Sequence, residues 1–290
     1  MPIENTFFES ALFQATGLDH QIKNITSVPG GDINQAARLI THHDTYFIKY
    51  NGMAVGDLFE KEALGLALLA ETRTLKIPEV TGQGTAAGNH FLILEYLNQE
   101  APSHNFWEEF GRSLAQLHQH SNEHFGLGHD NHIGRLHQKN TCNSTWVDFF
   151  IENRLEVQLG LAIYNDHVDP SFAKKFRQLY AQLPGIFPEE PPALIHGDLW
   201  SGNFMCGPNS VPCIYDPAVY YGHREMELAF TRLFGGFDLQ FYQSYHETFP
   251  LQPNFEDRID IYNLYPLLVH VNLFGPSYLS GIHSTISRFL

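Results

Sequence analysis

Ile195-His196-Gly197-Asp198-Leu199-Trp200-Ser201-Gly202-Asn203 decides the fold of this 290-residue chain, together with Ile214-Tyr215-Asp216 further on. The first stretch places an Asp five residues before an Asn, and the second ends a short apolar run with another Asp. Phosphoryl transfer from ATP needs these groups: one carboxylate receives the proton of the attacking hydroxyl, and an amide and a second carboxylate hold Mg²⁺ on the phosphates. We therefore predict that Asp198 is catalytic and that Asn203 and Asp216 bind Mg²⁺.

The spacing Asp-x-x-x-x-Asn, with a His two residues before the Asp, is that of the kinase catalytic loop. The alternative interpretation is a surface turn, because Gly, Asp, Ser and Asn all favour turns. The pattern His-x-Asp-x-x-x-x-Asn is expected by chance in roughly one per cent of chains of this length. A downstream Asp after a strand and an upstream Lys on a strand are further conditions, and each lowers the odds of coincidence.

Lys49 lies in the apolar run Tyr46-Phe47-Ile48-Lys49-Tyr50, which reads as a strand. A lysine in such a run needs either solvent or an anion. It is therefore either an edge-strand residue facing water or the lysine that binds the α- and β-phosphates of ATP and pairs with a helix Glu. Glu62 on the following helix is the expected partner, and Glu60, on a different face of that helix, is the alternative.

Gly30 and Gly31 lie where a loop covering the phosphates is expected, because glycines let backbone N–H groups approach an anion closely. A plain hairpin turn is the other interpretation of this pair. Neither the Gly-x-Gly-x-x-Gly pattern nor the Gly-x-x-x-x-Gly-Lys-Ser/Thr pattern is present. Further along, backbone groups of Glu95 and Leu97 are expected to hydrogen-bond an adenine whose ring is covered by apolar side chains.

Short strand-like runs separated by turns fill the first third of the chain and predict an antiparallel sheet. Helical periods dominate the rest. The expected strands cover 22–28, 36–40, 46–50, 80–85, 91–95, 193–195, 203–206 and 212–216, and the expected helices cover about 4–16, 58–68, 103–120, 144–164, 170–183, 224–234, 238–248, 256–272 and 277–289. The fold class is therefore α+β, bilobal and protein-kinase-like. Residues 1–97 form the nucleotide-binding lobe, and 98–290 form the helical lobe with the catalytic loop and acceptor site.

The chain carries 32 acidic residues against 17 Lys and Arg, for a formal net charge of −15. Such a surface repels nucleic-acid phosphates and anionic membranes, so neither is an expected partner. Apolar stretches of about 18 residues, which a membrane span needs, are absent. Three cysteines do not make a disulfide framework, and the first residues lack a basic n-region. We therefore expect a cytoplasmic protein.

Asp216-Pro217-Ala218 stands where protein kinases have Asp-Phe-Gly, and no Ala-Pro-Glu segment follows. Without these parts the chain has no recognisable activation segment for gripping a protein, which favours a small molecule or a modified residue as acceptor. Glu225 and Glu227 open a helix, and we interpret them as acids that suit its positive end. Trp200 is either a core residue or one wall of the acceptor pocket, since aromatic rings serve both.

These residues resemble the fructosamine kinase (ketosamine 3-kinase) family, a branch of the aminoglycoside and choline kinase-like phosphotransferases. The family motif His-Gly-Asp-Leu-Trp-Ser-Gly-Asn stands at 196–203, and Tyr-Asp-Pro-Ala and Tyr-Gly-His follow at 215–218 and 221–223. Phe59-Glu60-Lys61-Glu62 resembles the segment that carries the Lys-pairing Glu, which selects Glu62. The resemblance runs nearly end to end.

The resemblance also implies an acceptor site. Segments at 130–134, 146–150 and 267–275 are similar to family segments on that side, and they supply Trp146, His270 and Asn272 beside Trp200 as expected substrate-binding residues. The implied reaction uses Mg²⁺ and ATP to phosphorylate the 3-hydroxyl of a free or protein-bound ketosamine, which leads to deglycation. Two alternatives stay open: a related kinase for an aminoglycoside or amino alcohol, and a non-catalytic nucleotide-binding protein of the same fold.

Overall fold

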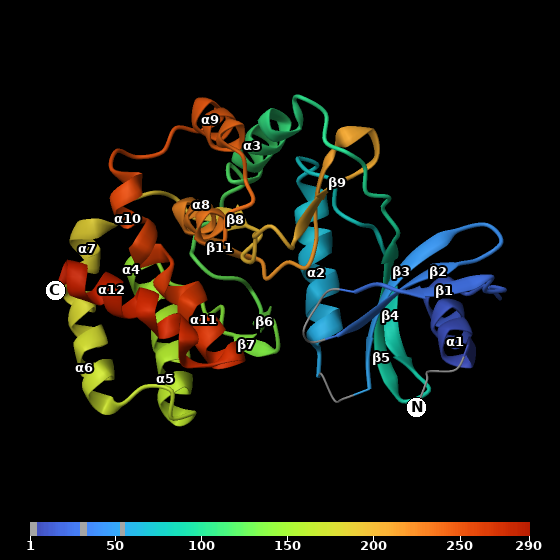
Figure 1. Cartoon of the computed structure of the whole chain (residues 1–290), viewed down its shortest axis with the longest axis horizontal. Helices are drawn as coiled ribbons and strands as arrows, with labels where there is room; N and C mark the ends of the chain where they lie inside the picture. Colours follow the sequence, from blue (N-terminus) through green and yellow to red (C-terminus); the bar gives the residue numbers. More distant parts are fainter. Residues whose placement is uncertain (1–4, 30–33, 53–55) are drawn as a thin grey trace. The chain divides into compact units, whose positions relative to one another are not determined.

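The computed structural model describes residues 5–29, 34–52 and 56–290 (Figure 1). The chain divides into two compact units. The first unit combines the residues up to Ser103 with Met205–Asp216, and the second combines His104–Phe204 with Pro217–Leu290. The sequence placed the boundary after residue 97 and assigned everything beyond it to one lobe, so the two divisions differ in the segments 98–103 and 205–216.

Five antiparallel strands form the sheet of the first unit, in the order β1-β2-β3-β5-β4. They are β1 Asn24–Ser27, β2 Gln35–Ile40, β3 Thr45–Asn51, β4 Val80–Ala86 and β5 Asn89–Glu95, and the unit also contains helices α1 Asn5–Thr16 and α2 Leu58–Glu71. The antiparallel sheet expected from the sequence is confirmed.

One face of this sheet is covered by α1, whose Phe7, Phe8 and Leu12 are buried in a cluster with Leu39 and Ile48 of the strands. Side chains alternate between the two faces of a strand. Because Ile48 faces α1, its neighbour Lys49 projects from the opposite face of β3. The apolar pattern of the strand therefore fixes where this lysine can reach.

The hairpin of β9 Phe204–Cys206 and β10 Pro212–Ile214 carries the segment 205–216 into the first unit. The backbone nitrogen of Ile214 donates to the carbonyl of Lys76 at 3.1 Å, and that of Lys76 donates to the carbonyl of Pro212 at 3.2 Å. On the other strand, Glu100 donates its backbone N–H to the carbonyl of Cys206 at 2.9 Å. These bonds explain why Asp216, which follows β10, is grouped with Lys49.

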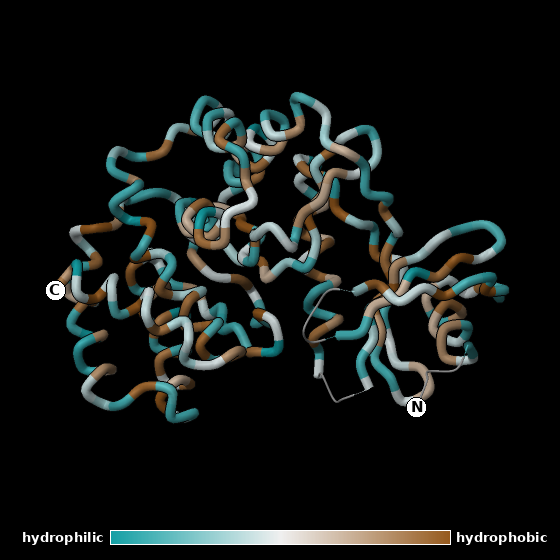
Figure 2. Tube along the Cα trace, viewed as in Figure 1, coloured by the Kyte–Doolittle hydropathy of each residue, from teal (hydrophilic) through white to brown (hydrophobic). Residues whose placement is uncertain are grey.

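The second unit is mainly helical. Its helices are α3 Phe106–Leu117, α4 Trp146–Phe149, α5 Glu156–Tyr164, α6 Pro170–Gln178, α7 Leu183–Ile186, α8 Arg224–Leu233, α9 Leu239–Thr248, α10 Phe255–Tyr262, α11 Leu264–Phe274 and α12 Leu279–Phe289. Two short antiparallel pairs accompany them, β6 Asn131–Ile133 with β7 Leu136–Gln138 and β8 Ala193–Ile195 with β11 Tyr220–Gly222. Hydrophobic and hydrophilic residues are interspersed along the chain (Figure 2), and a helix that packs by one face needs both kinds.

The single helix expected over 256–272 is wrong, because the chain forms two helices that meet at Asn263. Pro266 explains the break: it has no N–H to donate, and its ring clashes with the carbonyl four residues earlier, at Tyr262. The strands β6, β7 and β11 were not predicted, since three residues are too few to show a period. Among the described residues, no helix has the length and apolar character needed to cross a membrane.

Candidate active site

Lys49 lies in the central strand of the first unit's sheet, paired with Ala36 of β2 and Leu92 of β5. It is only 7% exposed, so the edge-strand interpretation is wrong. Its Nζ donates to Glu62 Oε1 at 2.7 Å and also to Asp216 Oδ1. The structure therefore brings together the lysine, the helix glutamate and one predicted metal ligand.

The charges of this cluster depend on one another. Burial lowers the pKa of Lys49, but the attraction of Asp216 and Glu62 outweighs burial and raises the pKa above its usual value. Burial also raises the pKa of the Glu62 carboxyl, against the opposing effect of Lys49. The two carboxyl groups thus favour the charged form of Lys49. They also hold its ammonium group in a fixed position.

Asp216 adopts a left-handed backbone conformation, with φ of 58°. Non-glycine residues seldom do so, and such conformations cluster at functional sites because the surrounding structure must hold them. The Asp216 side chain is also 39% exposed, unlike the buried Lys49 and Glu62. Its carboxylate is therefore the accessible member of the cluster.

The second unit holds the loop with Asp198 and Asn203. Asn203 Nδ2 donates to the carbonyl of Asp198 at 2.8 Å and to Asp198 Oδ2 at 2.9 Å. This geometry turns Asn203 Oδ1 away from Asp198 and fixes the direction of the carboxylate. His196 is buried, and its Nδ1 accepts from the backbone nitrogen of Asp198 at 3.3 Å, so this histidine supports the loop.

Gly197 is required by space as well as by conformation. Its φ is +83°, and a Cβ added there would lie 2.1 Å from the carbonyl oxygen of Ala218. Beside this contact, the backbone nitrogen of Ala218 donates to the carbonyl of His196 at 2.9 Å. The glycine lets the loop and the segment after Asp216 run against each other.

The capping interpretation is wrong for Glu227 on α8. It is buried, its Oε1 accepts from the backbone nitrogen of Gly197 at 2.9 Å, and its Oε2 accepts from that of His196 at 3.2 Å. His118 Nε2 lies 2.8 Å from the same Oε2. The carboxylate thus anchors the loop just before Asp198. A signal was present in the apolar residues that follow Glu227, which mark a buried stretch of helix.

The capping interpretation is also wrong for Glu225. Its carboxylate is buried and pairs with Arg258, Oε1 lying 2.6 Å from Nη2. The helix is instead capped by His223, whose side chain accepts from the backbone nitrogen of Glu225. Buried acids of this kind need partners far along the chain, which local sequence does not reveal.

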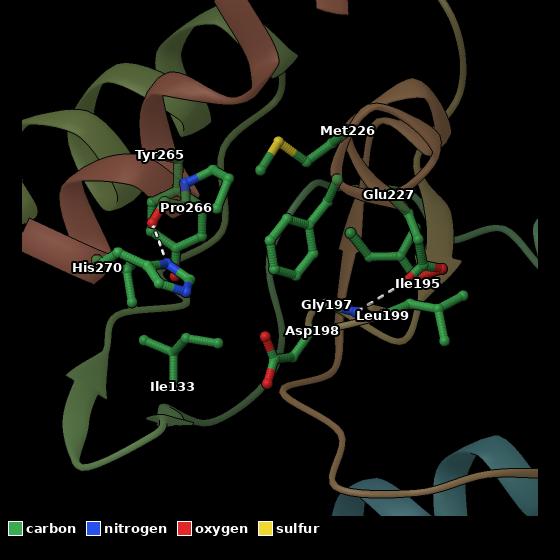
Figure 3. A pocket seen from close by; sticks show the side chains of 12 residues that line it. Ile133, Ile195, Gly197, Asp198, Leu199, Met226, Glu227, Tyr265, Pro266 and His270 are labelled. Carbon is green, nitrogen blue, oxygen red and sulfur yellow. Dashed lines mark hydrogen bonds between the residues drawn. The ribbon is translucent and has the colours of Figure 1, made fainter. Parts of the chain in front are cut away.

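A pocket in the second unit opens at Asp198 and has about 350 Å³ of empty space, including space open to solvent. Its wall comes from the catalytic loop, α8, α11 and β6 and is mainly apolar: Ile133, Ile195, Gly197, Asp198, Leu199, Met226, Glu227, Phe230, Tyr265, Pro266, Val269 and His270. In Figure 3 the Asp198 carboxylate points into the pocket, toward the side with Ile133 and His270. A few polar groups in an apolar concavity are typical of small-molecule sites.

His270, one of the predicted substrate-binding residues, lines this pocket. Its Nδ1 lies 2.7 Å from the carbonyl oxygen of Pro266, and burial lowers its pKa below the usual histidine value. Phe234 packs on it with ring centroids 4.9 Å apart, and Trp200 packs on Phe234 at 6.4 Å. Trp200 is 38% exposed, so it is not a core residue, although it does not itself line the pocket.

Two other expected substrate residues lie elsewhere. Trp146 is 5% exposed and stacks on Phe150 with ring centroids 5.2 Å apart, so it belongs to an aromatic core. Asn272 is buried, and its Nδ2 donates to Gln158 Oε1 at 2.8 Å. Neither side chain lines the pocket.

Of the residues expected to contact adenine and phosphates, the structure describes Glu95 and Leu97. The backbone nitrogen of Glu95 donates to the carbonyl of Glu79 at 2.8 Å, and its carboxylate lies 2.6 Å from Lys76 Nζ. Leu97 is buried. Gly30 and Gly31 lie outside the described residues.

Asn203 and Asp216 offer an amide and a carboxylate oxygen, the hard donors that Mg²⁺ prefers. Among the residues that the structure describes, His, Cys, Asp and Glu nowhere gather in threes to hold a metal ion. Mg²⁺ characteristically takes one or two protein oxygens and completes its shell with phosphates and water. Each of these two side chains is therefore of the type that Mg²⁺ takes from a protein when phosphates complete its shell.

The chain is similar to known proteins over nearly its whole length. A sequence model described as fructosamine kinase matches residues 6–290. The chain is 42% identical over 269 residues to "Probable ketoamine kinase slr1563" of Synechocystis sp., covering 91% of this chain and 90% of that protein. It is 38% identical over 275 residues to the chloroplastic protein-ribulosamine 3-kinase of Arabidopsis thaliana, covering 93% and 83%.

The fold agrees with these matches. A solved structure from Haemophilus somnus 129PT, assigned as a fructosamine-3-kinase, superposes with a TM-score of 0.87 at 30% identity and covers 99% of this chain and 100% of its own. The α+β, kinase-like fold expected from the sequence is thereby confirmed. The chain belongs to the fructosamine kinase family and is a phosphotransferase.

Proposed function

We propose that this protein is an ATP- and Mg²⁺-dependent kinase that phosphorylates the sugar 3-hydroxyl of ketosamines, the fructose or ribulose adducts of amines and protein lysines. The observation that carries the proposal is the Asp198 carboxylate, held by Asn203 and pointing into a mainly apolar pocket. The relatives named as ketoamine and ribulosamine kinases support the sugar-amine class of substrate.

On the acceptor side, Asp198 orients the attacking hydroxyl and takes up its proton. Phosphoryl transfer passes through a loose transition state, so positioning contributes more than base strength. Asn203 contributes to this positioning because its Nδ2 fixes Asp198 Oδ2. Glu227 and His196 hold the loop by accepting hydrogen bonds from the backbone nitrogens of Gly197 and Asp198.

On the nucleotide side, Lys49 neutralises phosphate charge, and Glu62 holds the ammonium group in position. Asn203 and Asp216 would hold Mg²⁺, which when bound with ATP would offset negative charge on the transferred phosphoryl group. Gly30, Gly31, Glu95 and Leu97 remain our proposed backbone contacts to phosphates and adenine.

The substituent on the ketosamine nitrogen lies, in our proposal, toward His270 and Trp200. The exposed Trp200 ring offers a flat apolar face to an amine substituent. A secondary amine is cationic at neutral pH, and a chain with a formal net charge of −15 attracts it. Trp146 and Asn272 are left out of this site because both side chains are buried elsewhere.

The test is a panel of acceptors incubated with Mg²⁺ and ATP: fructosamine, ribulosamine and erythrulosamine adducts, an aminoglycoside and an amino alcohol. We expect the ketosamines to be phosphorylated fastest, with NMR placing the phosphate on the 3-oxygen. Faster transfer to the aminoglycoside or amino alcohol would identify a related kinase instead. Binding of Mg-ATP without turnover of any acceptor would identify a non-catalytic nucleotide-binding protein.

A further inference from the structure

Gln138 on β7 joins three parts of the second unit through a single buried amide. Its Oε1 accepts from the hydroxyl of Tyr265 at 2.6 Å. Its Nε2 donates to Asn131 Oδ1 at 2.8 Å and to the carbonyl of Ala218 at 3.0 Å. With only 2% of its surface exposed, Gln138 makes these bonds away from competing water.

Behind Gln138 the network continues to a buried arginine. Asn131 Oδ1 also accepts from Asn140 Nδ2 at 2.9 Å, and Arg154 Nη2 donates to Asn140 Oδ1 at 2.8 Å. Arg154 is fully buried, and the ring of Tyr220 lies 3.9 Å from its guanidinium carbon. Each bond fixes the orientation of the next amide, and buried hydrogen bonds linked in this way make the segment rigid.

Arg154 lies in a π-helix, Phe150–Leu155, between α4 and α5. Segments of this kind are rare and occur frequently at functional sites. Here the π-helix supplies Arg154, the residue at the end of the network farthest from Gln138. Its position in the fold is thus set by an unusual backbone as well as by its own hydrogen bonds.

At the Gln138 end, the network contacts two elements of the candidate active site, Ala218 and Tyr265. Ala218 follows Asp216 by two residues, and its backbone nitrogen donates to the carbonyl of His196 at 2.9 Å. Its carbonyl lies against Gly197, next to Asp198. Tyr265 is part of the pocket wall, on α11 (Figure 3). The Gln138 side chain bonds to both Ala218 and Tyr265.

We propose that Gln138, anchored through Asn131 and Asn140 by Arg154, is a positioning residue for phosphoryl transfer. Through its bond to Ala218 it holds the segment after Asp216 beside the catalytic loop. Through its bond to Tyr265 it fixes that part of the pocket wall relative to Asp198. The inference rests on the proposed function in that it assigns Asp198 and Asp216 to the reaction. A misplacement of about 1 Å at such groups can cost about 100-fold in rate.

The test compares Gln138→Leu with Gln158→Leu. Gln158 is a matched control because it is equally buried at 2% and also accepts a bond, but its partner Asn272, unlike Tyr265, does not line the pocket. We expect Gln138→Leu to lower kcat about 100-fold and to raise the Mg²⁺ concentration needed for half-maximal rate. Gln158→Leu should lose similar thermal stability with kcat changed less than about twofold. Equal losses of kcat in both variants, or in neither, would overturn the proposal.

Tyr265→Phe gives a second, milder variant that keeps the ring and removes only the hydroxyl. We expect a loss of kcat of about tenfold in the wild-type background and none in the Gln138→Leu background, because the shared bond is already gone. Independent, additive losses would contradict the coupling.

Rates are compared on whichever acceptor of the panel the unaltered protein phosphorylates fastest. Absent ketosamine turnover then counts against the proposed function alone. If kcat of Gln138→Leu relative to the unaltered protein equals that of Gln158→Leu, the result counts against the positioning role alone.

Discussion

Glu227 Oε1 accepts a hydrogen bond of 2.9 Å from the backbone nitrogen of Gly197, the residue before Asp198. The other oxygen of the same carboxylate accepts from His196 and contacts His118. A bond from an N–H to a charged acceptor is stronger than a neutral one and holds direction well. A buried residue of α8 thus helps to hold the loop that carries Asp198.

Glu227→Gln should lower kcat by about 10- to 100-fold with little change in KM for ATP, because one loop N–H would then face an amide donor. Steady-state kinetics at saturating acceptor check this. Glu225→Gln is the matched control, since Glu225 is buried on the same helix but pairs with Arg258. It should lower the melting temperature and spare kcat. A similar kcat loss in both variants would show that α8 matters only for stability.

Asp198→Asn should reduce kcat by about 10²- to 10⁴-fold, the usual range for losing a positioned general base. The amide has the same size, so the melting temperature should stay close to that of the unaltered protein. Single-turnover transfer of labelled phosphate measures the effect. Activity within a few fold of the original would remove Asp198 from the mechanism.

Lys49→Met should weaken ATP binding and lower the free energy of unfolding by about 3–5 kcal/mol, because it leaves the buried Glu62 without its cation. Chemical denaturation and titration with Mg-ATP check the two effects. Lys61→Met is the control on the next helix, where the exposed pair with Asp57 at 3.6 Å contributes about 0.3–0.5 kcal/mol. Equal stability of the two variants would contradict the role of the buried pair.

The pH dependence should involve His270, whose pKa is lowered by burial. A histidine with a lowered pKa is neutral above its ordinary value of about 6.5 and gains a proton only as pH falls below it. The added charge would repel a cationic ketosamine, so KM for the acceptor should rise in acid while staying flat above neutrality. His270→Gln should remove that rise. Persistence of the same profile in the variant would assign it to another group.

The sequence predicted the parts of the site that local spacing controls. Asp198 and Asn203 are five residues apart on one loop, so their contact follows from the motif. The apolar pattern around Lys49 predicted a strand, and Glu62 on the next helix was a near neighbour along the chain. The antiparallel sheet followed from repeated turns between short apolar runs.

Burial and distant partners could not be predicted in the same way. Glu227 meets His118 across 109 residues, and Trp146 shows its core role only when Phe150 and other rings enclose it. Gln138 sits in a three-residue strand with no recognisable period. In each case the residue type suited several roles, and tertiary packing chose among them.

The chain order of the first unit has a consequence for synthesis. Lys49 and Asp216 are 167 residues apart, and the hairpin before Asp216 completes a unit whose other residues end at Ser103. Chains emerge from the ribosome amino terminus first, and contacts of long sequence separation form late. A nascent chain that stops short of residue 205 therefore leaves Lys49 paired with Glu62 alone. The sheet can form early, but the first unit is completed only after much of the helical unit has been made.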